Sequence, residues 1–181
     1  MSAGHGHIDP SNKKIALLIA VLALVLAFSE TLGKAAQTSA LSLNIEASNL
    51  WAFFQAKTIR QTVLRTAADQ TALAASTEEA KKQIEAWRKT AQRYQSEPET
   101  GEGRDELMAR AKEAEKKRDR AMAAYHQYEL ASAAVQIAIV LASAAIVTGA
   151  MALAWIGVGL GVVGVAFCLI GFLAPTSVHI F

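Results

Sequence analysis

The chain has 181 residues, of which 52% are hydrophobic and 19% are charged, and its net charge is +2. This apolar balance, with only three prolines, is typical of a helical membrane protein and argues against a soluble domain. Positions 29–129 hold 16 of the 18 Lys and Arg residues and 15 of the 16 Asp and Glu residues. Because a nucleic-acid surface is basic on balance, this nearly neutral span argues against nucleic acid as a partner. The single cysteine, Cys168, excludes an intramolecular disulfide.

Residues 1–14 are predicted to form a flexible tail, because their first twelve residues carry Gly, Pro and Ser without apolar periodicity. His5 and His7 lie in this tail. Two imidazoles on a mobile segment make a weak metal site, so no bound metal is expected there.

Three apolar segments are predicted to cross a membrane as helices: residues 15–33, 130–147 and 150–173. Such a helix needs about 20 residues at a rise of about 1.5 Å each, and the second segment is near the lower limit. Gly149 permits a tight turn between the second and third segments. Residues 174–181 are predicted to form a short tail.

Small side chains line one face of the third segment. They recur at alternating spacings of four and three, which makes one seam with few side-chain atoms on a helix: Ala150, Ala154, Gly157, Gly161, Gly164, Cys168 and Gly171. The second segment has a similar set: Ala134, Ala138 and Ala142. In lipid, such seams gain stability from close backbone approach and dispersion contacts with another helix. The pattern therefore predicts helix-packing faces.

Two polar residues fall within or beside the apolar segments. Gln136 is predicted to hydrogen-bond to a neighbouring helix, because an unpaired amide in hydrocarbon is costly. Glu30 is predicted to pair with Lys34 one turn away, and a buried functional carboxylate is the alternative.

Residues 34–129 are predicted to form an extramembrane, coiled-coil-like antiparallel hairpin, because small and apolar residues recur there at spacings of four and three. The predicted interface residues of this hairpin are Ile45, Trp51, Ala52, Phe54, Ile59, Val63, Leu73, Ile84, Trp87, Tyr94, Leu107 and Tyr125. Trp51 and Phe54 belong to an aromatic cluster that is predicted to contact the core or a partner helix. A membrane-interface belt is the alternative for this cluster.

Two positions compete for the reversal of the hairpin. Ser76 and Glu79 form a capping-box pattern, and residues 97–103 contain one Pro and two Gly. A reversal at Pro98 alone gives arms of about 95 Å and about 39 Å, whereas a reversal near Ser76 gives arms of about 42 and about 46 residues. The matched lengths favour a reversal near Ser76, with a break in the returning arm at 97–103. A bent or membrane-lying first helix is the alternative.

The charges beside the apolar segments indicate the orientation. Lys13 and Lys14 favour a cytoplasmic N-terminus, which puts the hairpin in the periplasm. The basic cluster at 116–120 favours the opposite orientation, but the rule weakens for loops longer than about 60 residues. The hairpin is therefore predicted to be periplasmic.

Two stretches resemble one known family. Residues 46–60, EASNLWAFFQAKTIR, resemble the signature of a bacterial membrane-protein family catalogued only as a domain of unknown function, and residues 130–143 resemble the second span of that family. The resemblance covers most of the chain in order. It implies one span, a helical hairpin and two closing spans in a bacterial inner membrane, with no assigned activity.

Motifs for chemistry are missing from the sequence. It contains no Gly-rich phosphate loop, no dinucleotide fingerprint, no Cys/His set with zinc spacing and no nucleophile-triad motif. His179 in the C-terminal tail is predicted to be exposed rather than catalytic. We therefore expect no catalytic residue, no cofactor and no metal, and the protein is predicted not to be an enzyme.

Together these features predict an all-α membrane protein with three transmembrane helices and a long extramembrane hairpin. The leading hypothesis is a scaffold or accessory subunit of the bacterial inner membrane. Its partners would be membrane lipids and other proteins, either copies of itself in a homo-oligomer or a larger membrane protein complex. The small-residue seams and the hairpin would form the contacts with these proteins. The alternative is a pore or transport component, with Glu30 and Gln136 lining a path.

Overall fold

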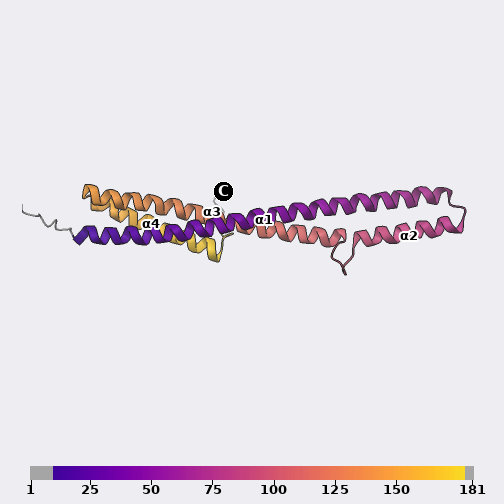
Figure 1. The fold of residues 1–181 in the computed structure, drawn as a ribbon, viewed down its shortest axis with the longest axis horizontal. Coiled ribbons are helices and arrows are strands. Elements are labelled where there is room, and N and C mark those ends of the chain that lie inside the picture. Colours follow the sequence, from indigo (N-terminus) through magenta and orange to yellow (C-terminus); the bar gives the residue numbers. More distant parts are fainter. Residues whose placement is uncertain (1–9, 178–181) are drawn as a thin grey trace, which may run out of the picture. The chain divides into compact units, whose positions relative to one another are not determined.

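The computed structural model describes residues 10–177. Over this range the chain contains no strand and forms four helices, which are α1 (Pro10–Ala74), α2 (Glu78–Gln95), α3 (Arg104–Thr148) and α4 (Met151–Leu173) (Figure 1). Helices α1, α3 and α4 each contain a segment that is long and apolar enough to cross a membrane. The all-helical prediction is confirmed for the described residues.

Helix α1 begins earlier than the sequence suggested. Its first residue is Pro10, where the fixed φ of proline suits the first helical position. Residues 10–14, assigned above to the tail, therefore belong to the helix. His5, His7 and His179 lie outside the described residues.

The contacts divide the chain into two units. The described part of the first, here called the three-helix unit, consists of residues 10–40 and 119–177. The second, here called the hairpin unit, is Leu41–Arg118.

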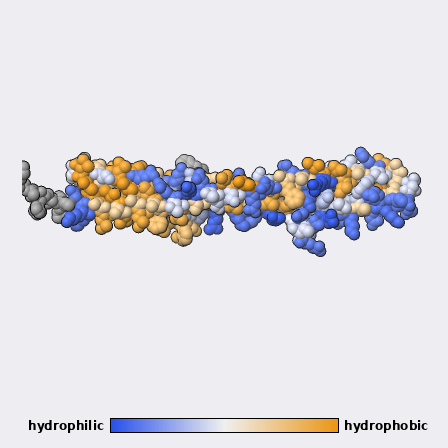
Figure 2. All heavy atoms as spheres, in the orientation of Figure 1, coloured by the Kyte–Doolittle hydropathy of each residue, from blue (hydrophilic) through white to orange (hydrophobic). Residues whose placement is uncertain are grey.

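The three-helix unit packs small and branched apolar residues from α1, α3 and α4. Its two buried clusters consist of Ile15, Ala142, Ala145 and Ala154, and of Leu22, Val135 and Ala138. Helix α3 ends at Thr148 because Gly149 adopts a φ of 72°, a left-handed conformation that glycine takes without steric cost. The Gly149 amide donates to the Ala145 carbonyl oxygen at 2.9 Å, which closes the helix end before α4 starts. Figure 2 shows hydrophobic residues covering most of the visible surface of this unit.

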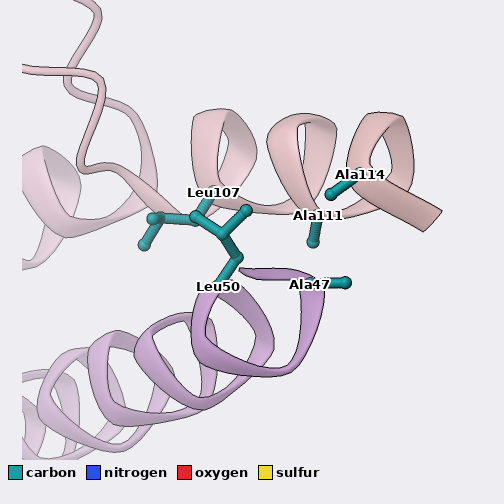
Figure 3. Close-up of a cluster of buried hydrophobic side chains, with 5 residues drawn as sticks. All are labelled: Ala47, Leu50, Leu107, Ala111 and Ala114. Atoms are coloured by element: carbon teal, nitrogen blue, oxygen red, sulfur yellow. The ribbon is translucent and has the colours of Figure 1, made fainter. Parts of the chain in front are cut away.

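The hairpin unit packs the second half of α1 against α2 and the first part of α3. Ala47 and Leu50 of α1 meet Leu107, Ala111 and Ala114 of α3 in one buried cluster (Figure 3). The alanines allow the two helices to approach closely, since a helix surface without long side chains brings the backbones together.

The chain reverses at residues 75–77, where the matched arm lengths placed the reversal. Helix α2 starts after Thr77, whose hydroxyl accepts a hydrogen bond from the Ala80 amide at 3.2 Å. The capping residue is thus Thr77 and not Ser76. Contacts such as Arg88 Nη2 to Asp69 Oδ1, at 3.3 Å, show that α2 runs back along α1.

A second break lies between α2 and α3, at residues 96–103, where Pro98 and two glycines were expected to interrupt the returning arm. Helix α3 then continues from Arg104 to Thr148 without a break, so the returning arm and the second apolar segment are one helix.

Candidate functional site

The small-residue seam of α4 packs against helices of the same chain. Ala154, Gly157, Gly161, Gly164 and Gly171 are buried, Cys168 is half-buried and Ala150, at the helix cap, is exposed. A Cβ atom added at Gly157 would lie 3.0 Å from the Ala138 carbonyl oxygen, and one at Gly161 would lie 2.6 Å from Cδ2 of Leu22. Both α3 and α1 therefore pack against the seam.

The surface of α3 that faces the seam is built from alanines and one valine along most of its length, and Gln127 and Tyr128 lie against Gly171. Ala138 and Ala142 are fully buried and Ala134 is half-buried. A Cβ atom at Gly164 would collide with Cγ2 of Val135. The predicted packing seams thus have partners inside the molecule.

Two polar pairs join α1 to α3 in the three-helix unit. The Ser132 hydroxyl donates to Oγ of the fully buried Ser29 at 3.0 Å. The Gln136 amide donates to a carboxylate oxygen of Glu30 at 3.3 Å, and both side chains lie on the outside of the unit. Gln136 therefore bonds between helices as expected, and Glu30 has a partner on α3. The alternative of a buried Glu30 carboxylate is wrong.

In the hairpin unit, the α1 register predicted from the sequence is wrong. Ile45, Ala52, Ile59, Val63 and Leu73, which were placed in the interface, are all exposed. The residues that face α2 and α3 instead form an inner seam on the opposite side of α1, at the same heptad spacing: Ala47, Leu50, Phe54, Lys57, Gln61, Leu64 and Ala68. The prediction chose the stripe with the larger aliphatic side chains, whereas the buried stripe contains a lysine and a glutamine.

The other predicted interface residues lie mainly where α2 and α3 meet α1. Ile84 and Leu107 are buried, and Trp87 and Tyr94 are half-buried. Tyr125 is half-buried but belongs to the three-helix unit, which corrects its assignment to the hairpin.

Trp51 and Phe54 pack against the buried cluster of Figure 3 and against each other, with ring centroids 5.4 Å apart and nearly perpendicular planes. The Trp51 indole donates to a Glu115 carboxylate oxygen on α3 at 2.9 Å. The aromatic cluster is therefore a contact between helices of the hairpin.

Lys57 is the most unusual residue of the inner seam, because it is charged and only 5% exposed. Its ammonium lies 3.9 Å from a carboxylate oxygen of Glu97 and 3.7 Å from one of Glu102, both in the region of the second break. It also lies over two aromatic rings, 5.4 Å from the Phe53 centroid and 5.1 Å from the Tyr94 centroid. The two carboxylates and two rings together offset the cost of removing this charge from water.

Gln61, one turn further along α1, is 2% exposed and completes a polar network. Its amide nitrogen donates to the Ala91 carbonyl oxygen at 2.9 Å, and its amide oxygen accepts from Arg104 Nη1 at 2.6 Å. The Arg104 guanidinium lies 5.0 Å from the centroid of the Phe54 ring. We call the group of Lys57, Gln61, Tyr94, Glu97 and Arg104 the polar junction, because it joins α1, α2 and α3 at one level.

The break itself is held closed by Glu106 in the first turn of α3. The Ser96 hydroxyl donates to one of its carboxylate oxygens at 2.6 Å and the Glu97 amide to the other at 3.2 Å. These hydrogen bonds, that from Ser96 first, hold the pKa of the Glu106 carboxyl below its usual value. Gly103 packs so tightly that an added Cβ would lie 2.5 Å from the Glu97 nitrogen and 2.7 Å from Cα of Ser96.

Sequence reasoning missed the polar junction, because charges on helices were interpreted as solvated ion-pair faces. The sequence did contain a signal that Lys57 is buried. Lys57 lies seven residues after Leu50 and seven before Leu64, so it occupies the same face as two leucines.

In the part of the chain that the structure describes, no group of three His, Cys, Asp or Glu side chains could hold a metal ion. In the polar junction Gln61 bonds to both α2 and α3, whereas the buried Arg104 Nε has no hydrogen-bond partner among the described residues. The hydrogen bonds of Gln61 link the three helices.

A family model described as "Domain of unknown function (DUF4337)" matches residues 11–174. No curated protein and no solved structure matches the chain. Residues 46–60, which carry the family resemblance, include Phe53, Phe54 and Lys57 of the inner seam and its surroundings.

Proposed function

The chain belongs to the DUF4337 domain family, and we propose that it acts as a non-enzymatic scaffold or accessory subunit of the bacterial inner membrane. In this proposal the three-helix unit is the anchor. The hairpin unit is the part that meets other proteins.

The outer surface of the three-helix unit supports the anchoring role. Large apolar side chains on all three helices are mostly exposed there, among them Leu17 (67%), Phe28 (60%), Trp155 (71%) and Phe172 (69%). In water an apolar surface of this extent would be an aggregation site, whereas lipid tails solvate it.

The inward direction of the α4 seam is the observation that carries the division of roles. Residues of α1 and α3 of the same chain already pack on Gly157, Gly161 and Gly164, so the glycine seam of the anchor is not free to bind another protein. Contacts with other proteins then fall to the hairpin, whose arms continue α1 and α3 without a helix break.

The polar junction supports a scaffold more than an enzyme. Buried polar groups that bond across helices, as Gln61 does to Ala91 and Arg104, favour one register of the helices, which is the best-attested role of such groups. A hairpin of fixed register presents a constant surface to a partner.

Membrane extraction and thiol labelling test the proposal. The protein should stay in the membrane pellet after an alkaline carbonate wash, and its release would contradict the anchor. In a Cys168→Ser background, Thr100→Cys should react with a membrane-impermeant maleimide on intact spheroplasts, because the hairpin is proposed to be periplasmic. Labelling only after lysis would place the hairpin in the cytoplasm.

A pore would give a different labelling pattern. In the same background, Gln136→Cys and Val140→Cys are both exposed positions on α3, and in a scaffold both should react slowly because they face lipid or protein. Rapid reaction of Gln136→Cys alone would indicate a water-filled path and contradict the scaffold.

A further inference from the structure

The exposed stripe on α1 in the hairpin unit has the pattern of a coiled-coil seam. Its members, here called the outer stripe, are Ile45, Asn49, Ala52, Ala56, Ile59, Val63, Thr66, Gln70 and Leu73. All of them are exposed except Ala56, which is half-buried. They recur at spacings of three and four over 29 residues, which keeps them on one face of a helix. This face is opposite to the inner seam, so no helix of the hairpin unit covers it.

The large members of the outer stripe are strongly exposed. Ile45 is 54% exposed, Ile59 64%, Val63 60% and Leu73 90%. Figure 2 shows hydrophobic areas along α1 in this unit. Single exposed aliphatic residues are ordinary, but a row at heptad spacing is the surface that a second helix covers.

Charge separates this face from the rest of the hairpin unit. Residues 41–74 contain five charged side chains, whereas residues 75–118 contain 21. Of the five, Lys57 is buried in the polar junction and Asp69 is paired with Arg88. No member of the outer stripe is charged.

We propose that the outer stripe binds the same stripe of a second copy of this chain, as a parallel, in-register two-helix coiled coil. The inference rests on the proposed function, because anchoring is what aligns the copies. In two copies inserted in the same way, residues 41–74 follow the first membrane-crossing segment on the same side of the membrane, with residue 41 of each copy next to its own segment. This shared connection favours the parallel arrangement.

A polar position in the stripe is the feature that favours a parallel pair of identical helices. In heptad notation Ile45, Ile59 and Leu73 occupy d positions, and Asn49 and Val63 occupy a positions. A polar Asn at one a position is the device that specifies register in parallel dimers, where it meets its own copy. Because the stripe itself carries no charge, two identical stripes do not repel each other.

The size of the contact is that of a small interface. The stripe is about 44 Å long at 1.5 Å per residue, and a helix face is about 10–12 Å wide. Two such faces bury about 1,000 Å² in total, which is about the minimum for a biological interface and is typical of weak association. The anchor adds to this by confining both copies to one membrane.

Cysteine crosslinking in membranes tests both the contact and its direction. In the Cys168→Ser background, Ile45→Cys and Leu73→Cys should each form a disulfide-linked dimer under a mild oxidant, because identical d positions meet in a parallel pair. Arg65→Cys is an exposed position on α1 outside the stripe and is the matched control. It should crosslink at least tenfold less.

The other outcomes are equally informative. Crosslinking only between Ile45→Cys and Leu73→Cys chains mixed in one membrane would mean an antiparallel pair and overturn the proposal. Equal crosslinking of the Arg65→Cys control would also overturn the proposal. Crosslinked adducts whose mass shows a different protein on the outer stripe would overturn it as well.

A second variant removes the contact without touching the hairpin core. Ile59→Asp with Val63→Asp should weaken the dimer at least tenfold in native mass spectrometry from mild detergent, with helicity unchanged by circular dichroism. Full dimer retention would contradict the proposal. If crosslinking fails while the protein resists carbonate extraction, the dimer is wrong and the anchor stands. Release by carbonate would instead contradict the anchor itself.

Discussion

The two units of this molecule place different residues between their helices. In the three-helix unit the contact is made by residues with little or no side chain, as at Gly157, which meets the backbone of Ala138. In the hairpin unit alanines such as Ala47 and Ala111 also allow close approach, but polar side chains lie beside them: Lys57 and Gln61 are buried among carboxylates, amides and rings. If the three-helix unit lies in lipid, as proposed, no hydrophobic force acts between its helices and shape decides their contact, whereas buried hydrogen bonds favour one register in the hairpin unit.

The largest expected effect tests whether shape alone holds the three-helix unit together. Gly157→Leu should cost about 3 kcal/mol or more, because its side chain would collide with the backbone of α3. Thermal unfolding in detergent measures the loss. Gly159→Leu is the matched control, since nothing lies within 4 Å of a Cβ atom at that position. If the two variants unfold alike, close backbone contact does not hold the unit together.

The next effect concerns the break between α2 and α3. Gly103→Ala should cost about 2 kcal/mol, because its Cβ would press on the backbone at Ser96 and Glu97, which cannot give way as a flexible side chain does. Gly101 has a φ of 68° and open space around it, so Gly101→Ala should cost only about 1 kcal/mol, through backbone strain. Chemical denaturation measures the loss of stability in both variants. A larger loss in Gly101→Ala than in Gly103→Ala would contradict the tight packing at Gly103.

The polar junction gives a smaller but sharper test. Lys57→Met keeps the aliphatic stem and removes the charge, and it should cost about 1 kcal/mol, because Glu97 and Glu102 keep access to water at 20% and 52% exposure. Lys81→Met breaks a shorter ion pair, 2.7 Å to Glu78, but both partners are exposed, so its cost should be near zero. Equal costs in denaturant titrations would mean that burial at Lys57 contributes nothing.

The smallest effect is a dependence on pH at the same break. The pKa of the Glu106 carboxyl is lowered in the folded protein, chiefly by the Ser96 hydroxyl, so its stabilisation is complete above the usual value of 4.5 and is lost as the pH falls through the lower folded value. Amide hydrogen exchange at residues 96–103 should therefore lose protection in acid beyond its intrinsic pH dependence. Glu106→Gln should remove that additional change, and an unaltered profile would assign it to another group.

Much of the fold followed from local sequence patterns. The apolar runs predicted three helices long enough for a membrane, and equal arm lengths placed the reversal near Ser76. Gly149 and the stretch with Pro98 marked the interruptions. These features depend on composition and chain length alone, which a single sequence contains in full.

The α1 register did not follow, because both of its faces carry heptad stripes. Ile59 and Val63 look like core residues until Gln61 is paired with Arg104, which lies 43 residues away in the chain. Burial of a lysine or a glutamine depends on partners from another helix, and no local pattern contains them. The polar junction could not be predicted for the same reason, because its partners come from three different helices.

The glycine seam also has a consequence for the order of events during biosynthesis. Leu22 leaves the ribosome long before Gly161, which it contacts in the finished protein, and Ala138 likewise precedes Gly157. In the proposed membrane anchor, α1 would therefore wait through the translation of more than a hundred further residues before α4, which covers it, is made. A chain shortened before α4 would leave Leu22 and Val135 without the glycine seam that packs on them.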